Sequence, residues 1–214
     1  MTIYAIASTK GGVGKSTTAV QIATLHAKAE ETLLIDADPQ ASSAIWAAWR
    51  REKGKLPVPT TARLYGKAVL NEGRVLSKGF KHTVIDTGGR DSESLRAALL
   101  LADMAIVPIG ASNLDAAALT DLQEILELSK QYNPNLQIRV LMTRLHPHPN
   151  SKDTLEMAKY LDESGFTVLK TRIHERVAYR RAIAEGLTVE EFETADSEAA
   201  KKEFVELFQE VTQA

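Results

Sequence analysis

The stretch Ser8–Thr18, with the sequence STKGGVGKSTT, determines how the rest of the chain is interpreted. It follows directly on the apolar, strand-like run Ile3–Ala7 and leads into a helical pattern. A glycine-rich loop between a buried strand and a helix start offers several backbone N–H groups, and the positive end of a helix dipole, to an anion. We therefore expect the loop to bind phosphate rather than to be a flexible, solvated turn.

The individual residues of the loop have separate roles in this expectation. Its backbone gains the freedom to wrap a phosphate from three glycines around Val13, which are Gly11, Gly12 and Gly14. Lys15 is placed to reach the β- and γ-phosphates of a nucleotide, and the Ser16 hydroxyl is placed to bind Mg²⁺. Thr9 stands where the usual phosphate loop has its first glycine, and Lys10 is a surplus lysine.

The composition indicates one globular domain over residues 1–214, with 44% apolar and 25% charged residues. A net charge of −2 and a pI near 6.2 argue against a protein that coats nucleic acid with its whole surface. The absence of cysteine excludes disulfides, thiolate metal sites and cysteine-bound iron–sulfur clusters. No signal-like or membrane-spanning run is visible, and we expect a cytoplasmic protein.

Two further segments place carboxylates where strands end. Asp36 and Asp38 follow the predicted strand Thr32–Ile35, and Asp86 follows the β-branched run that begins at His82. The carboxyl ends of parallel strands are where open α/β folds bind ligands. An aspartate before a proline also suits a helix N-cap, but two of them near a phosphate loop favour a functional role.

Taken in order, the motifs Lys10–Thr17, Asp36–Gln40 and Asp86–Gly89 resemble those of the deviant Walker A family of ATPases, the MinD/ParA family. The resemblance covers nearly the whole chain and implies ATP and Mg²⁺ as cofactors. Its phosphate loop implies a nucleotide site made of Lys10, Gly11, Gly12, Val13, Gly14, Lys15, Ser16 and Thr17.

The resemblance also implies roles for single residues. Lys10 would reach across a dimer into the partner's nucleotide, and Asp38 would orient the attacking water, so that Lys10, Lys15 and Asp38 are the catalytic candidates. Mg²⁺ would be held by Ser16 and Asp86 with Asp36 nearby. The segment Asp36–Gln40 would be the first switch. Gly88 and Gly89 would form the second switch by offering N–H groups to the γ-phosphate, although many relatives have prolines just after the aspartate that corresponds to Asp86.

The remaining chain alternates between predicted strands and helices, which indicates a doubly wound, mainly parallel α/β sheet with helices on both faces. Helices are expected at 17–29, 41–51, 66–77, 92–102, 113–132, 151–164 and 197–211. Further strands are expected at 61–64, 82–86, 104–108, 137–143 and 167–169. We interpret Trp46 and Trp49 as packing residues and the basic loop after them as a solvated surface.

The segment Ile173–Val189, near the C-terminus, resembles the same part of small ParA partition proteins. Residues 170–181 carry five cations against Glu175 alone. Such a cluster suits the uniform phosphate backbone of DNA, so non-specific DNA contacts are expected from Arg172, Arg176, Arg180 and Arg181. The alternative is that these arginines form ordinary salt bridges with Glu190, Glu191 and the last helix.

These features predict a weak, Mg²⁺-dependent ATPase that dimerises on ATP, binds DNA non-specifically on the nucleoid and is released when a small ParB/ParG-like partner stimulates hydrolysis. One rival is a metabolic ATP-dependent synthase or ligase on the same fold, for which no second acid–base constellation is visible. Another is a MinD-like ATPase that binds membranes. The last predicted helix has a polar face of mixed charge, which favours docking on its own domain.

Overall fold

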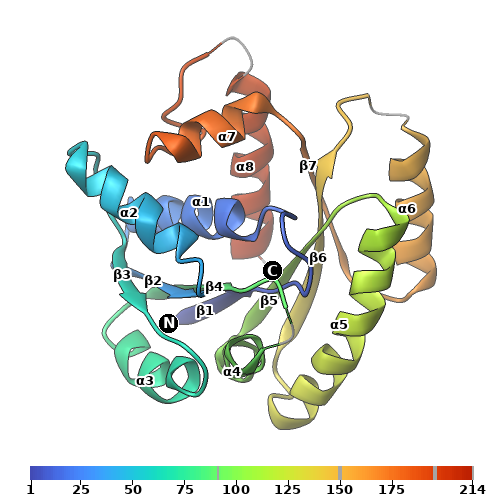
Figure 1. The fold of residues 1–214 in the computed structure, drawn as a ribbon, viewed down its shortest axis with the longest axis horizontal. Helices are drawn as coiled ribbons and strands as arrows, with labels where there is room; N and C mark the ends of the chain where they lie inside the picture. Colours follow the sequence, from blue (N-terminus) through green and yellow to red (C-terminus); the bar gives the residue numbers. More distant parts are fainter. Residues whose placement is uncertain (91, 149–150, 195–196, 214) are drawn as a thin grey trace.

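The computed structural model describes residues 1–90, 92–148, 151–194 and 197–213. A seven-stranded sheet forms its centre (Figure 1). The strands are β1 Thr2–Ile6, β2 Thr32–Ala37, β3 Thr60–Arg63, β4 His82–Thr87, β5 Met104–Ile109, β6 Gln137–Leu145 and β7 Val168–His174. They lie in the order β3-β2-β4-β1-β5-β6-β7, and each neighbouring pair is parallel.

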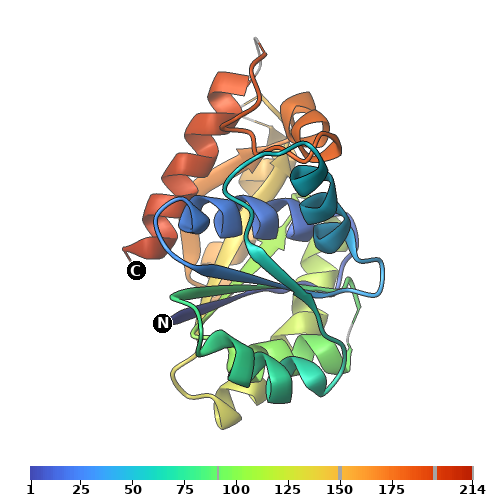
Figure 2. The same ribbon diagram turned by 90° about the vertical axis from the view of Figure 1, so that its left-hand side faces the viewer.

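Helices cover both faces of this sheet, as the view in Figure 2 shows. They are α1 Lys15–Ala27, α2 Ser42–Glu52, α3 Ala68–Ser77, α4 Glu93–Leu101, α5 Asn113–Tyr132, α6 Lys152–Glu163, α7 Val177–Ala184 and α8 Ser197–Thr212. Helices α1, α2, α7 and α8 share one apolar cluster with the sheet, and α3 to α6 share the other. The doubly wound α/β fold is therefore confirmed.

The central strands are buried on both faces, which explains their continuous apolar sequences. All six residues of β5, MAIVPI, are buried, and so are all six of β2, TLLIDA. In β2 the exception to the apolar run is Asp36, which is fully buried. A carboxylate at such a position needs partners, and it has them in the site described below.

Strand register brings the predicted motifs to one edge of the sheet. Asp36 lies opposite Asp86 in the β2–β4 pair, and Ile6 lies opposite Asp86 in the β1–β4 pair. The loop after β1 and both aspartates therefore meet at the carboxyl ends of three adjacent strands.

The structure differs from the sequence-based expectations near the C-terminus. The strand predicted at 167–169 continues to His174, and α7 follows it as a helix that we did not predict. Along β7 the side chains of Leu169, Thr171 and Ile173 are buried while those between them are exposed. This alternation is typical of a strand, but the lysine and arginine on its exposed side obscure it in the sequence.

Two expectations about apolar side chains have opposite outcomes. Trp46 is 1% exposed and packs in the core as expected, whereas Trp49 is 41% exposed, so its interpretation as a packing residue was wrong. Helix α8 buries Phe204, Leu207 and Val211 against the sheet, which confirms that it docks on its own domain.

Candidate nucleotide-binding site

The phosphate loop lies in a cleft of about 980 Å³ at the carboxyl edge of the sheet. Helix α1 begins at Lys15, two residues earlier than predicted, so its first N–H groups and its dipole face this cleft. The cleft collects predicted site residues from three segments, which are Gly11, Gly12, Gly14, Lys15, Ser16 and Thr17, then Asp38, then Gly88 and Gly89. The arrangement provides N–H donors, a lysine and carboxylates around one space.

Lys15 lies in the middle of the cleft. Its ammonium donates a hydrogen bond to the Lys10 carbonyl oxygen at 2.7 Å. Burial lowers the pKa of Lys15, and the nearby carboxylates of Asp86 and Asp38 act in the opposite direction. A Cβ atom on Gly89 would lie 3.1 Å from the backbone of Gly11 and 3.3 Å from the Lys15 ammonium, so glycine allows the second switch to approach the loop closely.

Asp86 is buried below the cleft with its two oxygens in different environments. Oδ2 accepts a hydrogen bond from the Ser43 hydroxyl at 2.5 Å, while Oδ1 is buried without a hydrogen-bond partner. Burial raises the pKa of Asp86 to about 7, and Ser43 and Ser16 act to lower it. Ser16 is near enough to Asp86 to act on its pKa, although the Ser16 hydroxyl forms no hydrogen bond with Oδ1.

These residues fit a magnesium ion. Mg²⁺ prefers oxygen ligands and is usually held by one or two carboxylates together with substrate phosphates. The free Oδ1 of Asp86 and the hydroxyl of Ser16 are such ligands. Ser16 lines the phosphate cleft, and the buried Asp86 lies close enough to interact with Ser16 and Lys15. The orphaned buried oxygen of Asp86 is the feature that a cation would satisfy.

Asp36 and Asp38 have different surroundings from Asp86. Both oxygens of Asp36 accept backbone hydrogen bonds, Oδ1 from Asp38 N at 3.1 Å and Oδ2 from Ala44 N at 2.7 Å. Asp36 therefore fixes the first switch and the start of α2. The half-buried Asp38 side chain lies at the rim of the cleft, where Oδ1 accepts a hydrogen bond from Gln40 N at 3.0 Å.

Lys10 points toward α5 instead of toward its own cleft. Its ammonium pairs with Asp115 Oδ1 at 2.6 Å and donates to the Ser112 hydroxyl at 3.4 Å. Ser112 and Asp115 also form the capping box of α5. Burial acts to raise the pKa of Asp115, but the hydrogen bonds from Lys10 and Ser112 outweigh it and the pKa is lowered.

Comparison of the sequence with family models shows which family the chain belongs to. A model of the CobQ/CobB/MinD/ParA nucleotide-binding domain matches residues 4–189. The chain belongs to this family.

Named relatives lie within the same MinD/ParA group. The maintenance of carboxysome distribution protein A of Gloeobacter kilaueensis is 31% identical over 208 residues, which cover 94% of this chain and 90% of the relative. The apo McdA structure from Cyanothece superposes with a TM-score of 0.78 at 22% identity, over 100% of this chain and 98% of the other. A putative plasmid partition protein from Borrelia burgdorferi bound to AMPPNP superposes with a TM-score of 0.73 at 24% identity, covering 99% and 98%. The two structures show the shared fold.

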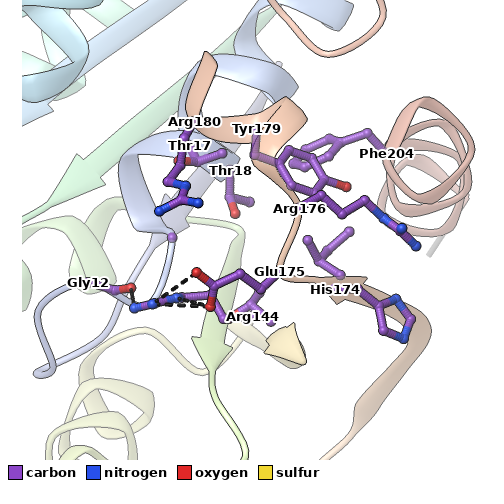
Figure 3. Close-up of a pocket in the computed structure, with 13 residues that line it drawn as sticks. Gly12, Thr17, Thr18, Arg144, His174, Glu175, Arg176, Tyr179, Arg180 and Phe204 are labelled. Carbon is purple, nitrogen blue, oxygen red and sulfur yellow. Dashed lines mark hydrogen bonds and ion pairs between the residues drawn. The ribbon is translucent and has the colours of Figure 1, made fainter. Parts of the chain in front are cut away.

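This MinD/ParA-family domain has a second pocket, of about 310 Å³, on the other side of the phosphate loop (Figure 3). Arg144 closes its lower end in the view, with Nη1 donating to the Gly12 carbonyl at 2.7 Å and Nη2 pairing with Glu175 at 3.2 Å. Tyr179 and Phe204 form the opposite wall, with their rings edge to face at 5.6 Å. The volume and lining suit a nucleoside attached to phosphates in the loop.

The four arginines predicted to contact DNA lie on or beside two elements of this MinD/ParA-family domain, β7 and α7. Arg172 is exposed on β7, whereas Arg176 pairs with Glu203 of α8 at 2.5 Å. Arg180 is exposed and lines the second pocket, and Arg181 is exposed on α7. The alternative of salt bridges with α8 therefore holds for Arg176, while Glu190 and Glu191 pair with other cations, Lys28 and Arg50.

Several residues of the MinD/ParA-family site were not found by sequence reasoning. Ser43, Ser112, Asp115 and Arg144 contact predicted site residues from distant parts of the chain. A capping-box pattern before a helix was visible at Ser112 and Asp115, but nothing local indicates that its aspartate also holds Lys10.

Proposed function

We propose that the protein is a ParA-type ATPase that uses ATP and Mg²⁺ to switch between a monomer and a DNA-bound dimer, and thereby positions a cargo on the nucleoid. The position of the Lys10 side chain is the observation that supports this proposal. Lys15 already lies in its own cleft, whereas the Lys10 ammonium is held at the molecular surface on Asp115, where its side chain is 30% exposed. A second loop lysine is thus available to neutralise the triphosphate of a second copy.

Within one protomer, different residues have different roles in phosphoryl transfer. The loop N–H groups and Lys15 bind the phosphates, Ser16 and Asp86 hold the metal, and the metal supplies neutralisation of the developing charge. Asp38 orients the attacking water from the rim of the cleft. With no strong base in the cleft, catalysis rests on positioning, which predicts slow turnover.

The second pocket would hold the nucleoside. Its wall includes Thr143, Arg144 and Glu175, which offer a hydroxyl, a guanidinium and a carboxylate beside the Tyr179 ring. A base stacked against an aromatic and bonded by polar groups is a common recognition mode. Placement beside Gly12 and Gly14 leaves the phosphates directly over the loop.

The relatives support cargo positioning as the biological output. One is named for carboxysome distribution and another for plasmid partition, so the activity that their names share is the positioning of a large cargo. We propose a cytoplasmic protein, non-specific DNA as its track and a small ParB/ParG-like partner that stimulates hydrolysis. Among the described residues, no helix is long and apolar enough to cross a bilayer.

Dimerisation tests the proposal. Light scattering should give a monomer mass with ADP and a dimer mass with a non-hydrolysable ATP analogue and Mg²⁺. Lys10→Ala should bind the analogue and stay monomeric. A parent protein that is monomeric with both nucleotides would contradict the proposal and favour a metabolic ATP-dependent synthase or ligase.

Turnover tests the role of Asp38. Asp38→Ala should keep ATP binding and lose hydrolysis, because the phosphate-binding groups lie elsewhere in the cleft. Hydrolysis at the parent rate would assign the water-orienting role to another residue.

A further inference from the structure

Helix α2 and the loop after it form an exposed surface that combines apolar and basic side chains. Ile45 and Trp49 are 44% and 41% exposed, and Leu56 in the loop is 79% exposed. Residues four apart lie on one side of a helix, so Ile45 and Trp49 form a stripe. We call this region the α2 surface and define it by Ile45, Trp49, Arg51, Lys53, Lys55 and Leu56.

The cations of the α2 surface form no ion pair with any described carboxylate. Arg51, Lys53 and Lys55 are exposed, and none forms an ion pair with a described residue. Glu52 is the acidic residue within the segment 51–56. Elsewhere in the chain Lys10, Lys28 and Arg144 are each paired with a carboxylate. Local positive charge is therefore left unpaired in a chain whose net charge is −2.

Arg50 fixes this surface to the chain that follows α7. The Arg50 side chain is fully buried and pairs with Glu191 at 2.6 Å, while it donates to the carbonyls of Pro57 and Gly186 at 2.6 and 3.1 Å. Gly186 has φ +66°, and a Cβ there would lie 2.7 Å from Arg50 N, so only glycine allows this approach. The loop of residues 53–57 is thereby anchored at both ends.

The close contact between Gly186 and Arg50 places α7 beside α2, as Figures 1 and 2 both show. Glu185 N donates to the Arg181 carbonyl at 3.2 Å, so the exposed Arg181 lies one helical turn before the segment that packs on Arg50. No described carboxylate pairs with Arg181 either. Among the described residues, Arg181 is thus a further unpaired cation, carried by the helix that lies beside α2.

We propose that the α2 surface, extended by Arg181, is a contact for the phosphate backbone of duplex DNA, with Trp49 lying against the sugar edge of the strand. The proposal rests on the DNA binding in the proposed function and gives that binding a location outside the arginine-rich segment. Unpaired lysines and arginines around a small apolar centre suit a polyanion. Two apolar side chains on an eleven-residue helix are too few for the buried face of a membrane-binding helix.

The α2 surface is also placed to respond to the nucleotide. The N-terminus of α2 is bonded to both buried aspartates, through Ala44 N to Asp36 and through the Ser43 hydroxyl to Asp86. A change in those carboxylates on binding Mg²⁺ and ATP therefore reaches the helix that carries the DNA contact. This connection accounts for ATP-dependent affinity together with the pairing of two surfaces in a dimer.

A matched pair of triple variants tests the location. Arg51→Ala with Lys53→Ala and Lys55→Ala removes three cations from the α2 surface. The control Arg74→Ala with Lys78→Ala and Lys81→Ala removes one arginine and two lysines that are also exposed and unpaired among the described residues, but that lie on or beside α3, on the opposite face of the sheet. Duplex DNA binding is measured for both across a salt series with the ATP analogue.

The α2 triple variant should bind a duplex at least about tenfold more weakly at physiological salt, and its plot of log affinity against log salt should lose about 3 units of slope per protomer. The α3 control should keep the parent affinity and slope. Dimer mass and ATP-analogue affinity are measured in the same samples to exclude loss of the dimer. Equal loss in both triple variants, or none in the α2 variant, would overturn the location. The proposed function fails separately if the parent itself does not bind DNA.

Tryptophan fluorescence supplies a second readout at the surface itself. Because Trp46 is buried and Trp49 exposed, binding of duplex DNA should change the emission of the parent, and Trp49→Phe should remove that change while the protein remains folded. Polyglutamate and vesicles of phosphatidylserine with phosphatidylcholine are tested in parallel. An emission change with either of these that equals or exceeds the change with DNA would overturn DNA as the occupant.

Discussion

The Asp86 carboxylate lies at the end of β4 with one oxygen bonded to Ser43 and the other without a partner. Burial raises its pKa to about 7, so folding favours the protonated form. Stability from this group is fully present below the ordinary pKa near 3.8 and is lost as the pH rises through 7. The charged carboxylate of Asp86 therefore destabilises the protein when no cation is bound to neutralise it.

Asp86→Asn should raise the free energy of unfolding at pH 8 in EDTA by up to about 4 kcal/mol, because the amide carries no charge to bury. The same variant should lose Mg²⁺-dependent ATP hydrolysis. Urea unfolding of the parent and the variant measures the gain, with Asp38→Asn at the exposed rim as the control. A variant less stable than the parent at this pH would show that the buried carboxylate is not under strain.

Ser43 orients the same carboxylate. Its hydroxyl acts to lower the pKa of Asp86 and donates a hydrogen bond to Oδ2, which leaves Oδ1 without a hydrogen-bond partner. Ser43→Ala should therefore raise the Mg²⁺ concentration needed for half-maximal binding of an ATP analogue by about tenfold, the cost of one hydrogen bond to a charged group. Analogue binding in EDTA should not change. Ser42→Ala removes an exposed hydroxyl from the adjacent position, and an equal effect there would contradict the role of Ser43.

The sequence indicates which residues meet where a single motif, or the register of neighbouring strands, places them together. The phosphate loop and the strand-end aspartates meet in one region because strand register places them there. Contacts such as Ser43 with Asp86 and Lys10 with Asp115 join residues 43 and 105 positions apart. Such pairings depend on tertiary packing, which no local pattern encodes.

At the scale of the elements, α5 holds the surplus lysine of the loop. Lys10 must leave Asp115 before it can reach the triphosphate of a second copy. Asp115→Asn should therefore strengthen ATP-dependent dimerisation, because it removes the ion pair and keeps an oxygen for the capping box. The dimer dissociation constant with the ATP analogue, measured by light scattering at several concentrations, checks this. A weaker dimer would mean that Asp115 holds Lys10 in its dimer position.

The end of α1 meets β1, β4 and α8 at a buried histidine. The ring of His26 stacks on that of His82 at 3.7 Å and on Tyr4 at 5.3 Å, and it contacts the edge of Phe208 at 4.7 Å. Burial, and then the proximity of His82, lowers the pKa of His26 to about 3. His82 in turn forms a hydrogen bond of 2.6 Å with Glu30. Glu30 supplies the carboxylate of this cluster.

A lowered histidine pKa means that His26 stays neutral in the folded protein while it becomes protonated in the unfolded chain below its ordinary pKa of 6.5. Stability from this group is therefore lost as the pH falls from 6.5 toward 3. Between pH 7 and pH 5 the parent should lose about 2 kcal/mol relative to His26→Phe, which does not titrate. Urea unfolding at both pH values measures the difference. Parallel pH dependences of the two proteins would contradict it.

The order of the elements was predictable because each central strand is a continuous apolar run between clear helix signals. The exceptions are β7 and α7, where lysine and arginine occupy the exposed positions of otherwise regular patterns. The sequence presents these positions as one cationic segment. The structure divides them between a strand, a salt bridge to Glu203 and the exposed side of a helix.

At the scale of the whole molecule, the two faces of the sheet differ in what they carry. Helices α3 to α6 cover one face, and α5 holds Lys10 near the phosphate cleft. The opposite face carries α2 and α7 with the unpaired cations of the α2 surface and Arg181. We thus propose different parts of one fold for nucleotide binding and for DNA binding, with α2 connecting them.

Binding of duplex DNA as a function of nucleotide tests the central claim most directly. Fluorescence anisotropy with two duplexes of unrelated sequence, across a salt series, should show tight and equal binding to both with the ATP analogue and Mg²⁺. With ADP the affinity should fall by at least about tenfold, because a monomer presents one surface and the dimer presents two. Affinity should also fall steeply with salt. Equal affinity with ATP analogue and ADP, or no binding with either, would contradict an ATP-switched DNA-binding dimer.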